Sequence, residues 1–204
     1  MQARQSLPEG YQKTSAMDFG RNKRQLYLSY LLRFASLLFF LVVFALVGIG
    51  FHASLGSSLL SFVDIAIPGL PGVLSILFIA LDVFLVLALH ELVHASVFWM
   101  FARSQFQIGI RGAVIFAAAP DWYFTKAPMV INALAPFTVI SIIGIVLMGI
   151  LPVTVIAWIF IPVVVNAAAA AGDFMLLIWI AGQKEGTFFK DTGDATVSYA
   201  PLSQ

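Results

Sequence analysis

Four long apolar segments, separated by short polar stretches, account for most of the chain. They cover residues of about 27–50, 74–101, 129–150 and 155–181. Each contains the roughly 20 residues that a helix needs to cross the hydrocarbon layer of a bilayer. The pattern therefore predicts an all-α membrane protein, built as a four-transmembrane-helix bundle in one integral membrane domain over residues 27–182.

The polar stretches differ in charge, and this difference predicts the side of the membrane on which each lies. Lys and Arg occur in residues 1–26, 103–126 and 183–204, whereas residues 51–73 have none. Basic residues accumulate in cytoplasmic loops. We therefore expect a cytoplasmic N-terminal tail (1–26), a cytoplasmic central loop and a cytoplasmic C-terminal tail (183–204) on a multi-pass protein of the cell membrane.

The central loop carries a short alternation of apolar and polar residues. From Phe106 to Arg111 the two kinds alternate, which is the period of a β-strand. Arg111–Gly112 is a candidate turn, and residues 113–118 are a candidate second strand. The loop is thus either a small β-hairpin on the cytoplasmic side or an irregular connection, and the sequence leaves both open.

The composition narrows the range of functions. Hydrophobic residues make up 61% of the chain and charged residues 10%, and the mean hydropathy is +0.98. These values are typical of a polytopic membrane protein. The net charge of +1 gives no general attraction to nucleic acid. Because cysteine is absent, any metal would be held by His, Asp, Glu or Asn side chains.

The candidate chemistry lies in the second apolar segment. The chain has three histidines, and two of them, His90 and His94, lie four residues apart with Glu91 between them. The surrounding residues 81–101 contain no Gly or Pro, so we expect a helix on which both imidazoles lie on one face, one turn apart. Two imidazoles at this spacing can share a metal ion, with Glu91 placed to take a proton from water.

The alternative for these residues is a structural cluster without a metal. Ionisable groups inside an apolar helix cost a few kcal/mol each on insertion scales. Three such groups within five residues are expected only if they satisfy one another or a metal. We therefore favour a metal site.

A catalytic zinc ion usually has three protein ligands, and Asp173 is the candidate for the third. His90 lies 13 residues before Arg103, and Asp173 lies 11 residues before Lys184. At 1.5 Å per residue, the two side chains lie at depths that agree within about 3 Å.

Two further polar residues lie in the apolar segments that carry these candidate ligands. Asn166 precedes Asp173 by seven residues and returns to the same helix face, so it is a candidate catalytic residue that positions the substrate or polarises its carbonyl. Asp82 lies about 80° around the helix from His90. It is a poor candidate ligand, and its role stays open.

The motif at residues 90–94, the inner loop with candidate strands, and the late Asn166 and Gly172–Asp173 together resemble the site-2 protease type of intramembrane metalloprotease. They are closer still to a bacterial family of putative zincin peptidases, and the resemblance covers about residues 74–182. It implies zinc held by His90, His94 and Asp173, with Glu91 as the catalytic base. The chain departs from the site-2 protease pattern, which typically ends in Asn-Pro and Asp-Gly, because no proline follows Asn166 and the glycine precedes the aspartate.

These inferences predict a zinc metallopeptidase that hydrolyses a peptide bond near the cytoplasmic face of the membrane. Its partners would be the lipid bilayer and a membrane protein or peptide substrate, whose unwound backbone pairs with the edge of the hairpin. One alternative is a non-catalytic membrane scaffold or regulator with a structural metal. A weaker alternative is a small transporter that uses Asp82 and Asp173 as proton sites. Glu91 favours the enzyme, since a structural site has no need of it.

Overall fold

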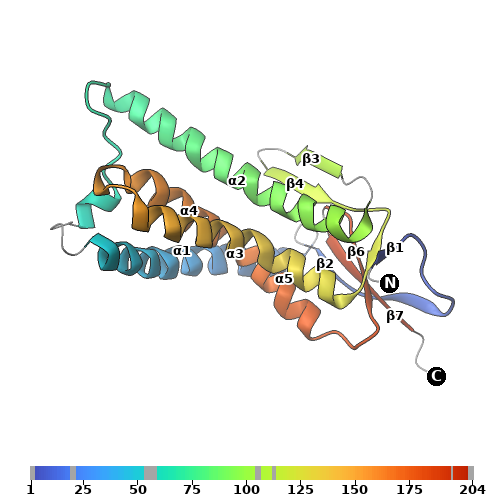
Figure 1. Cartoon of the computed structure of the whole chain (residues 1–204). Helices are drawn as coiled ribbons and strands as arrows, with labels where there is room; N and C mark the ends of the chain where they lie inside the picture. Colours follow the sequence, from blue (N-terminus) through green and yellow to red (C-terminus); the bar gives the residue numbers. More distant parts are fainter. Residues whose placement is uncertain are drawn as a thin grey trace. The chain divides into compact units, whose positions relative to one another are not determined.

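The computed structural model describes residues 3–18, 22–52, 59–103, 107–111, 114–193 and 195–201. Its longest elements are α1 (Lys23–His52), α2 (Gly72–Ala102) and α3 (Lys126–Ile150), followed by α4 (Ala157–Ala169) and α5 (Ala171–Ala181) (Figure 1). In length and apolar character, α1, α2, α3 and the combined stretch 157–181 are each sufficient to cross a membrane. The four predicted apolar helices are therefore confirmed, with ends that differ from the predicted ones by a few residues.

The last apolar segment forms two helices where the sequence predicted one. Ala170 separates α4 from α5, and its N–H donates to the carbonyl of Asn166 at 3.0 Å. Gly172, a poor helix former, is the second residue of α5. As a result Asn166 lies in the last turn of α4 and Asp173 in the first turn of α5.

A five-stranded antiparallel sheet makes the expectation of an all-α fold wrong. Its strands follow the order β1, β5, β6, β7, β2. They are β1 (Ala3–Arg4), β2 (Tyr11–Asp18), β5 (Tyr123–Phe124), β6 (Phe188–Asp191) and β7 (Ala195–Pro201). The segments predicted as tails thus supply most of this sheet. The longest pairing joins β2 to β7, where the hydroxyls of Ser15 and Ser198 lie 2.8 Å apart.

The central loop forms a separate two-stranded sheet. Strand β3 (Gln107–Arg111) pairs antiparallel with β4 (Val114–Ala118), with Ile108 opposite Ala117. The hairpin interpretation of this loop is therefore confirmed. The predicted turn at Arg111–Gly112 includes Gly112, which lies outside the described residues, as does Phe106.

The chain divides into two compact units, each with its own core. The sheet unit comprises residues 1–31, 91–136 and 172–204, and the helical unit comprises residues 32–90 and 137–171. The boundary passes through the continuous helix α2, between His90 and Glu91. Large buried side chains fill both cores: Phe98, Phe124, Met129, Ile180 and Phe189 in the sheet unit, and Phe44, Phe62, Met148, Ile156 and Phe160 in the helical unit. Two short 3-10 helices, η2 (Leu59–Phe62) and η3 (Val153–Val155), belong to the helical unit.

Candidate metal centre

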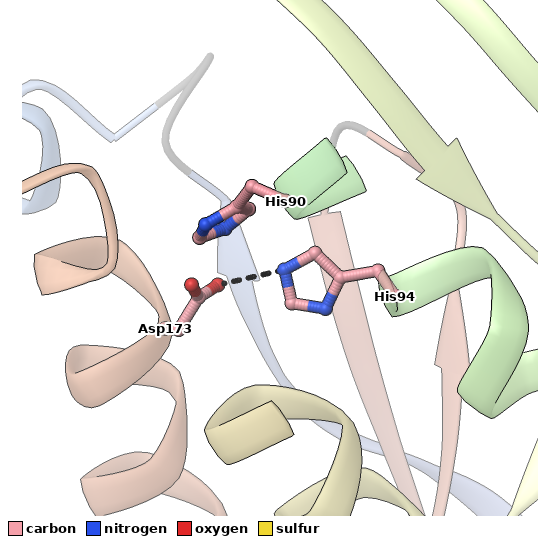
Figure 2. A group of neighbouring side chains, drawn as sticks. All are labelled: His90, His94 and Asp173. Carbon is pink, nitrogen blue, oxygen red and sulfur yellow. Dashed lines mark ion pairs between the residues drawn. The ribbon is translucent and has the colours of Figure 1, made fainter. Parts of the chain in front are cut away.

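Helix α2 holds two of the predicted ligands and α5 holds the third. His90 and His94 are buried and lie one turn apart on α2, and Asp173 lies in the first turn of α5. One possible ligand atom from each of the three residues lies within 4.8 Å of the other two. Figure 2 shows the two imidazole rings and the carboxylate gathered around one point. The structure therefore brings together the three residues that the sequence singled out as ligands.

The spacing and the chemistry of this group fit a zinc ion. The Nε2 of His94 lies 3.5 Å from Oδ1 of Asp173, the pair joined by the dashed line in Figure 2. Neighbouring ligands of a tetrahedral zinc ion, at bond lengths near 2.1 Å, are about 3.4 Å apart. Two imidazole nitrogens and one carboxylate oxygen form a donor set that catalytic zinc sites use, and it leaves one position open.

Each imidazole is held from behind by an asparagine. The Nδ1–H of His94 donates to Oδ1 of Asn132 at 2.6 Å, and the Nδ1–H of His90 donates to Oδ1 of Asn166 at 2.9 Å. An amide oxygen can only accept, so each Nδ1 carries a proton, and Nε2 is the ring nitrogen whose lone pair can bind a metal ion. Such outer partners orient metal-binding histidines and raise their basicity.

The two polar atoms of the Asn166 side-chain amide have different surroundings. Its side chain is fully buried, and Oδ1 is occupied by His90. In the described part of the chain, Nδ2 has no hydrogen-bond partner. The structure thus gives Asn166 a positioning contact with His90, which the sequence did not suggest. Its action on a substrate stays a prediction, for which Nδ2 is the available donor.

Asn132 received no role from the sequence. It lies in the second turn of α3 and is buried. The presence of a polar amide side chain in an apolar helix could have identified Asn132 as a candidate site residue from the sequence. A metal-binding histidine needs an acceptor for its Nδ1–H, and an amide is one of the few neutral side chains able to supply one.

The hairpin contacts the predicted catalytic base. The backbone N–H of Ala117 in β4 donates to Oε2 of Glu91 at 3.1 Å. In an antiparallel pair, a residue directs its N–H and C=O to the same side of its strand. The N–H of Ala117 therefore points away from β3, toward Glu91, and among the described residues no strand pairs with this edge of β4.

The sheet contains a further carboxyl, that of Asp191, which the sequence analysis placed in the C-terminal tail. Asp191, at the end of β6, accepts hydrogen bonds from the N–H of Gly193 at 2.7 Å and the hydroxyl of Thr196 at 3.3 Å. Burial raises the pKa of this carboxyl, while the Gly193 N–H and the charge of His94 act in the opposite direction. Asp191 is therefore close enough to the candidate metal centre to interact electrostatically with it.

One family of known proteins matches more than half of the chain. The family described as Putative zincin peptidase matches residues 83–188, which is 106 of the 204 residues. The matched region contains the three candidate ligands, Glu91 and both asparagines. No curated protein and no solved structure matches the chain. The resemblance to site-2 proteases stays a prediction.

Proposed function

The chain belongs to the family of putative zincin peptidases, and from this premise we propose that it is a zinc-dependent, membrane-embedded peptidase. It would hydrolyse a peptide bond of a membrane protein or peptide near the cytoplasmic face. One observation carries the proposal: each histidine donates its Nδ1–H to an asparagine, which leaves both Nε2 lone pairs for an ion shared with Asp173.

The ligand set favours catalysis over a structural metal. Three protein ligands leave one position for water or substrate, whereas structural zinc sites are closed by four. Glu91 lies beside His90 in the sequence but belongs to no ligand group among the described residues. Its carboxylate is instead held by the N–H of Ala117. A scaffold protein would have no use for a carboxylate fixed in this way.

The residues of the site divide the chemistry between them. A zinc ion bound by His90, His94 and Asp173 would supply Lewis acidity, which activates water and polarises the scissile carbonyl. Glu91 accepts a proton from the attacking water and delivers it to the leaving amine. Asn132 and Asn166 hold the two imidazoles in the tautomer that binds metal. The buried Nδ2 of Asn166 is a candidate donor to the substrate carbonyl.

The edge of β4 that faces Glu91 pairs with no strand among the described residues, and it provides a way to present the substrate. A helical segment uses its carbonyls in its own hydrogen bonds, so it must unwind before its backbone can be attacked. An unwound segment can add to the exposed edge of a sheet as a further strand. Because this edge faces Glu91, a strand that pairs with β4 would be held next to the base.

The substitution Glu91→Gln tests this function. We expect the variant to bind zinc as the wild type does but to cleave at least about 100-fold more slowly, since general base catalysis contributes about 10²–10⁴-fold. Cleavage would be followed by mass spectrometry, with zinc-loaded protein in vesicles and a library of model transmembrane peptides. Glu9→Gln, which changes an exposed glutamate away from the site, is the matched control.

Two results would contradict the proposal. One is equal cleavage by the wild type and Glu91→Gln. The other is an X-ray absorption spectrum showing zinc with four protein ligands, in a wild type that cleaves no library member. The second result would support the scaffold with a structural metal.

A further inference from the structure

Asp82 is the intramembrane carboxyl that the proposed chemistry does not use. It lies on α2, two helical turns before His90, in an open groove of about 560 Å³ in the helical unit. The other side chains that line this groove are apolar or aromatic. They include Phe78, Leu81 and Leu85 of α2, together with Val155 of η3 and Trp158 of α4.

No group within the described ranges satisfies this carboxyl. In residues 3–18, 22–52, 59–103, 107–111, 114–193 and 195–201, no hydrogen bond or ion pair reaches Asp82. An ionisable side chain in an apolar segment costs a few kcal/mol and is expected to have a partner. Phe78, Leu81 and Leu85 beside it are about half exposed, so this wall of the groove is uncovered. A partner from outside the chain can therefore reach Asp82.

We propose that this groove binds a membrane-spanning segment of the substrate through a Lys or Arg side chain that pairs with Asp82. The inference rests on the proposed function and names a feature of its substrate. A basic side chain suits the groove in two ways. Its aliphatic stem can lie along the apolar walls, and its charged end can meet the Asp82 carboxylate and the face of the Trp158 indole.

The depth of Asp82 favours a protein side chain over the ammonium of a lipid headgroup. Nine residues of α2, from Val73 to Leu81, precede it, and Ser75 is the only polar one among them. At 1.5 Å per residue, Asp82 lies about 15 Å along α2 from Gly72. A headgroup stays at the surface of the bilayer, whereas the long stem of Lys or Arg is carried inward by the helix to which it belongs.

The position of Asp82 on α2 also predicts where the substrate would be cut. Eight residues separate Asp82 from His90, which is about 12 Å along the helix. A substrate segment that runs beside α2 covers this distance with about eight residues if it is helical, and with about four if it is extended. We therefore expect the basic residue four to eight residues from the scissile bond, on the side away from the cytoplasm.

The test measures binding separately from cleavage. Glu91→Gln protein in phosphatidylcholine vesicles would be mixed with fluorescent leucine–alanine transmembrane peptides that carry one Lys, or Met in its place. We expect the Lys peptide to bind at least about 10-fold more tightly, as measured by energy transfer. The further substitution Asp82→Asn should abolish this preference, while Asp64→Asn, a loop carboxyl outside the groove, should preserve it.

Several outcomes would overturn the proposal. Equal binding of the Lys and Met peptides would do so, as would a preference that survives Asp82→Asn. If Asp82→Asn instead changed the retention of phosphatidylethanolamine, the groove would be a lipid site and the proposal would be wrong. The zinc content of Asp82→Asn should match that of the wild type, so that any loss of binding is separated from loss of the metal.

The experiments distinguish failure of the proposed groove site from failure of the proposed peptidase function. If the Lys peptide binds preferentially but the wild type never cleaves it, the peptidase function fails and the groove stands. If the wild type cleaves the Lys and Met peptides equally fast and at the same bond, the groove fails and the peptidase stands. If both inferences hold, moving the Lys by four residues along the peptide should move the cut in the same direction.

Discussion

The sheet unit and the helical unit differ in whether certain polar side chains have hydrogen-bond partners. In the sheet unit, His94 has Asn132, Glu91 has the N–H of Ala117, and Asp191 has Gly193 and Thr196. In the helical unit polar groups are fewer. Asp82 and the Nδ2 of Asn166 have no hydrogen-bond partner among the residues that the structure describes.

Polar groups that have partners fix the geometry of the candidate site, whereas polar groups without partners can bind a molecule from outside the chain. A buried polar group without a partner costs about 1–3 kcal/mol, and more if it is charged. The bonded groups of the sheet unit hold the candidate ligand His94 and the candidate base Glu91 in fixed orientations, which is what catalysis needs. The Asp82 carboxyl and the Nδ2 of Asn166 are costly unless a molecule from outside the chain completes them, and for this reason we connect these two groups to the substrate.

The largest effect should come from Asp173→Ala, which removes the candidate ligand on α5. We expect the zinc content of the purified protein to fall from one ion per chain to nearly none, because two imidazoles one turn apart bind zinc weakly without a third ligand. Metal analysis by mass spectrometry checks this. Asp121→Ala changes an exposed carboxyl outside the cluster and is the control. Undiminished zinc in Asp173→Ala would rule out this ligand set.

The two asparagines allow the units to be compared directly. Asn132→Ala in the sheet unit and Asn166→Ala in the helical unit should each weaken zinc binding by about 10–100-fold, the usual effect of losing an outer partner of a ligand. Competition with a chelator measures both. Asn166→Ala should destabilise the fold less than Asn132→Ala, since it also removes a buried donor that has no partner.

Ser141→Ala provides the control for this comparison. The Ser141 hydroxyl is buried in α3 and has no hydrogen-bond partner among the described residues, so its removal should leave zinc affinity unchanged. If both asparagine variants bound zinc as tightly as Ser141→Ala, the histidines would not depend on their outer partners.

A smaller effect should follow from Gly144→Ala, which tests packing inside the helical unit alone. A Cβ at Gly144 on α3 would overlap the side chain of Val163 on α4. Small residues allow such close helix contacts, and overpacking costs about 1–3 kcal/mol. Thermal unfolding in detergent should show a lower midpoint. Zinc affinity should change little, because neither Gly144 nor Val163 belongs to the ligand group.

Gly50→Ala is the matched control, since a Cβ there would meet no atom within 4 Å. Ala is the better helix former by up to about 1 kcal/mol, so this variant should be as stable as the wild type or slightly more so. A Gly144→Ala protein as stable as Gly50→Ala would show that the contact between α3 and α4 is looser than the structure indicates.

The sequence alone was sufficient to predict the helices and to select the three candidate ligands that the structure brings together. The apolar runs are long enough to specify helices without help from distant residues. The spacing of His90 and His94 places them on one face of any helix that contains them. Asp173 followed from counting residues to the nearest basic side chain, because both segments were predicted to run in the same direction through one slab of fixed thickness.

Only the tertiary structure decided the sheet and the partners of the site residues. Strand β2 pairs with β7 across 183 residues, from Ser15 to Ser198, and no periodicity within either short polar segment specifies the other. The same is true of the amide of Ala117 on Glu91, of Asn132 on His94 and of the groove around Asp82. Neighbours in the chain determine local conformation, whereas hydrogen bonds between distant segments form only after packing brings those segments together. The sequence therefore identified the candidate ligands and the candidate base, and the fold identified the groups that hold them.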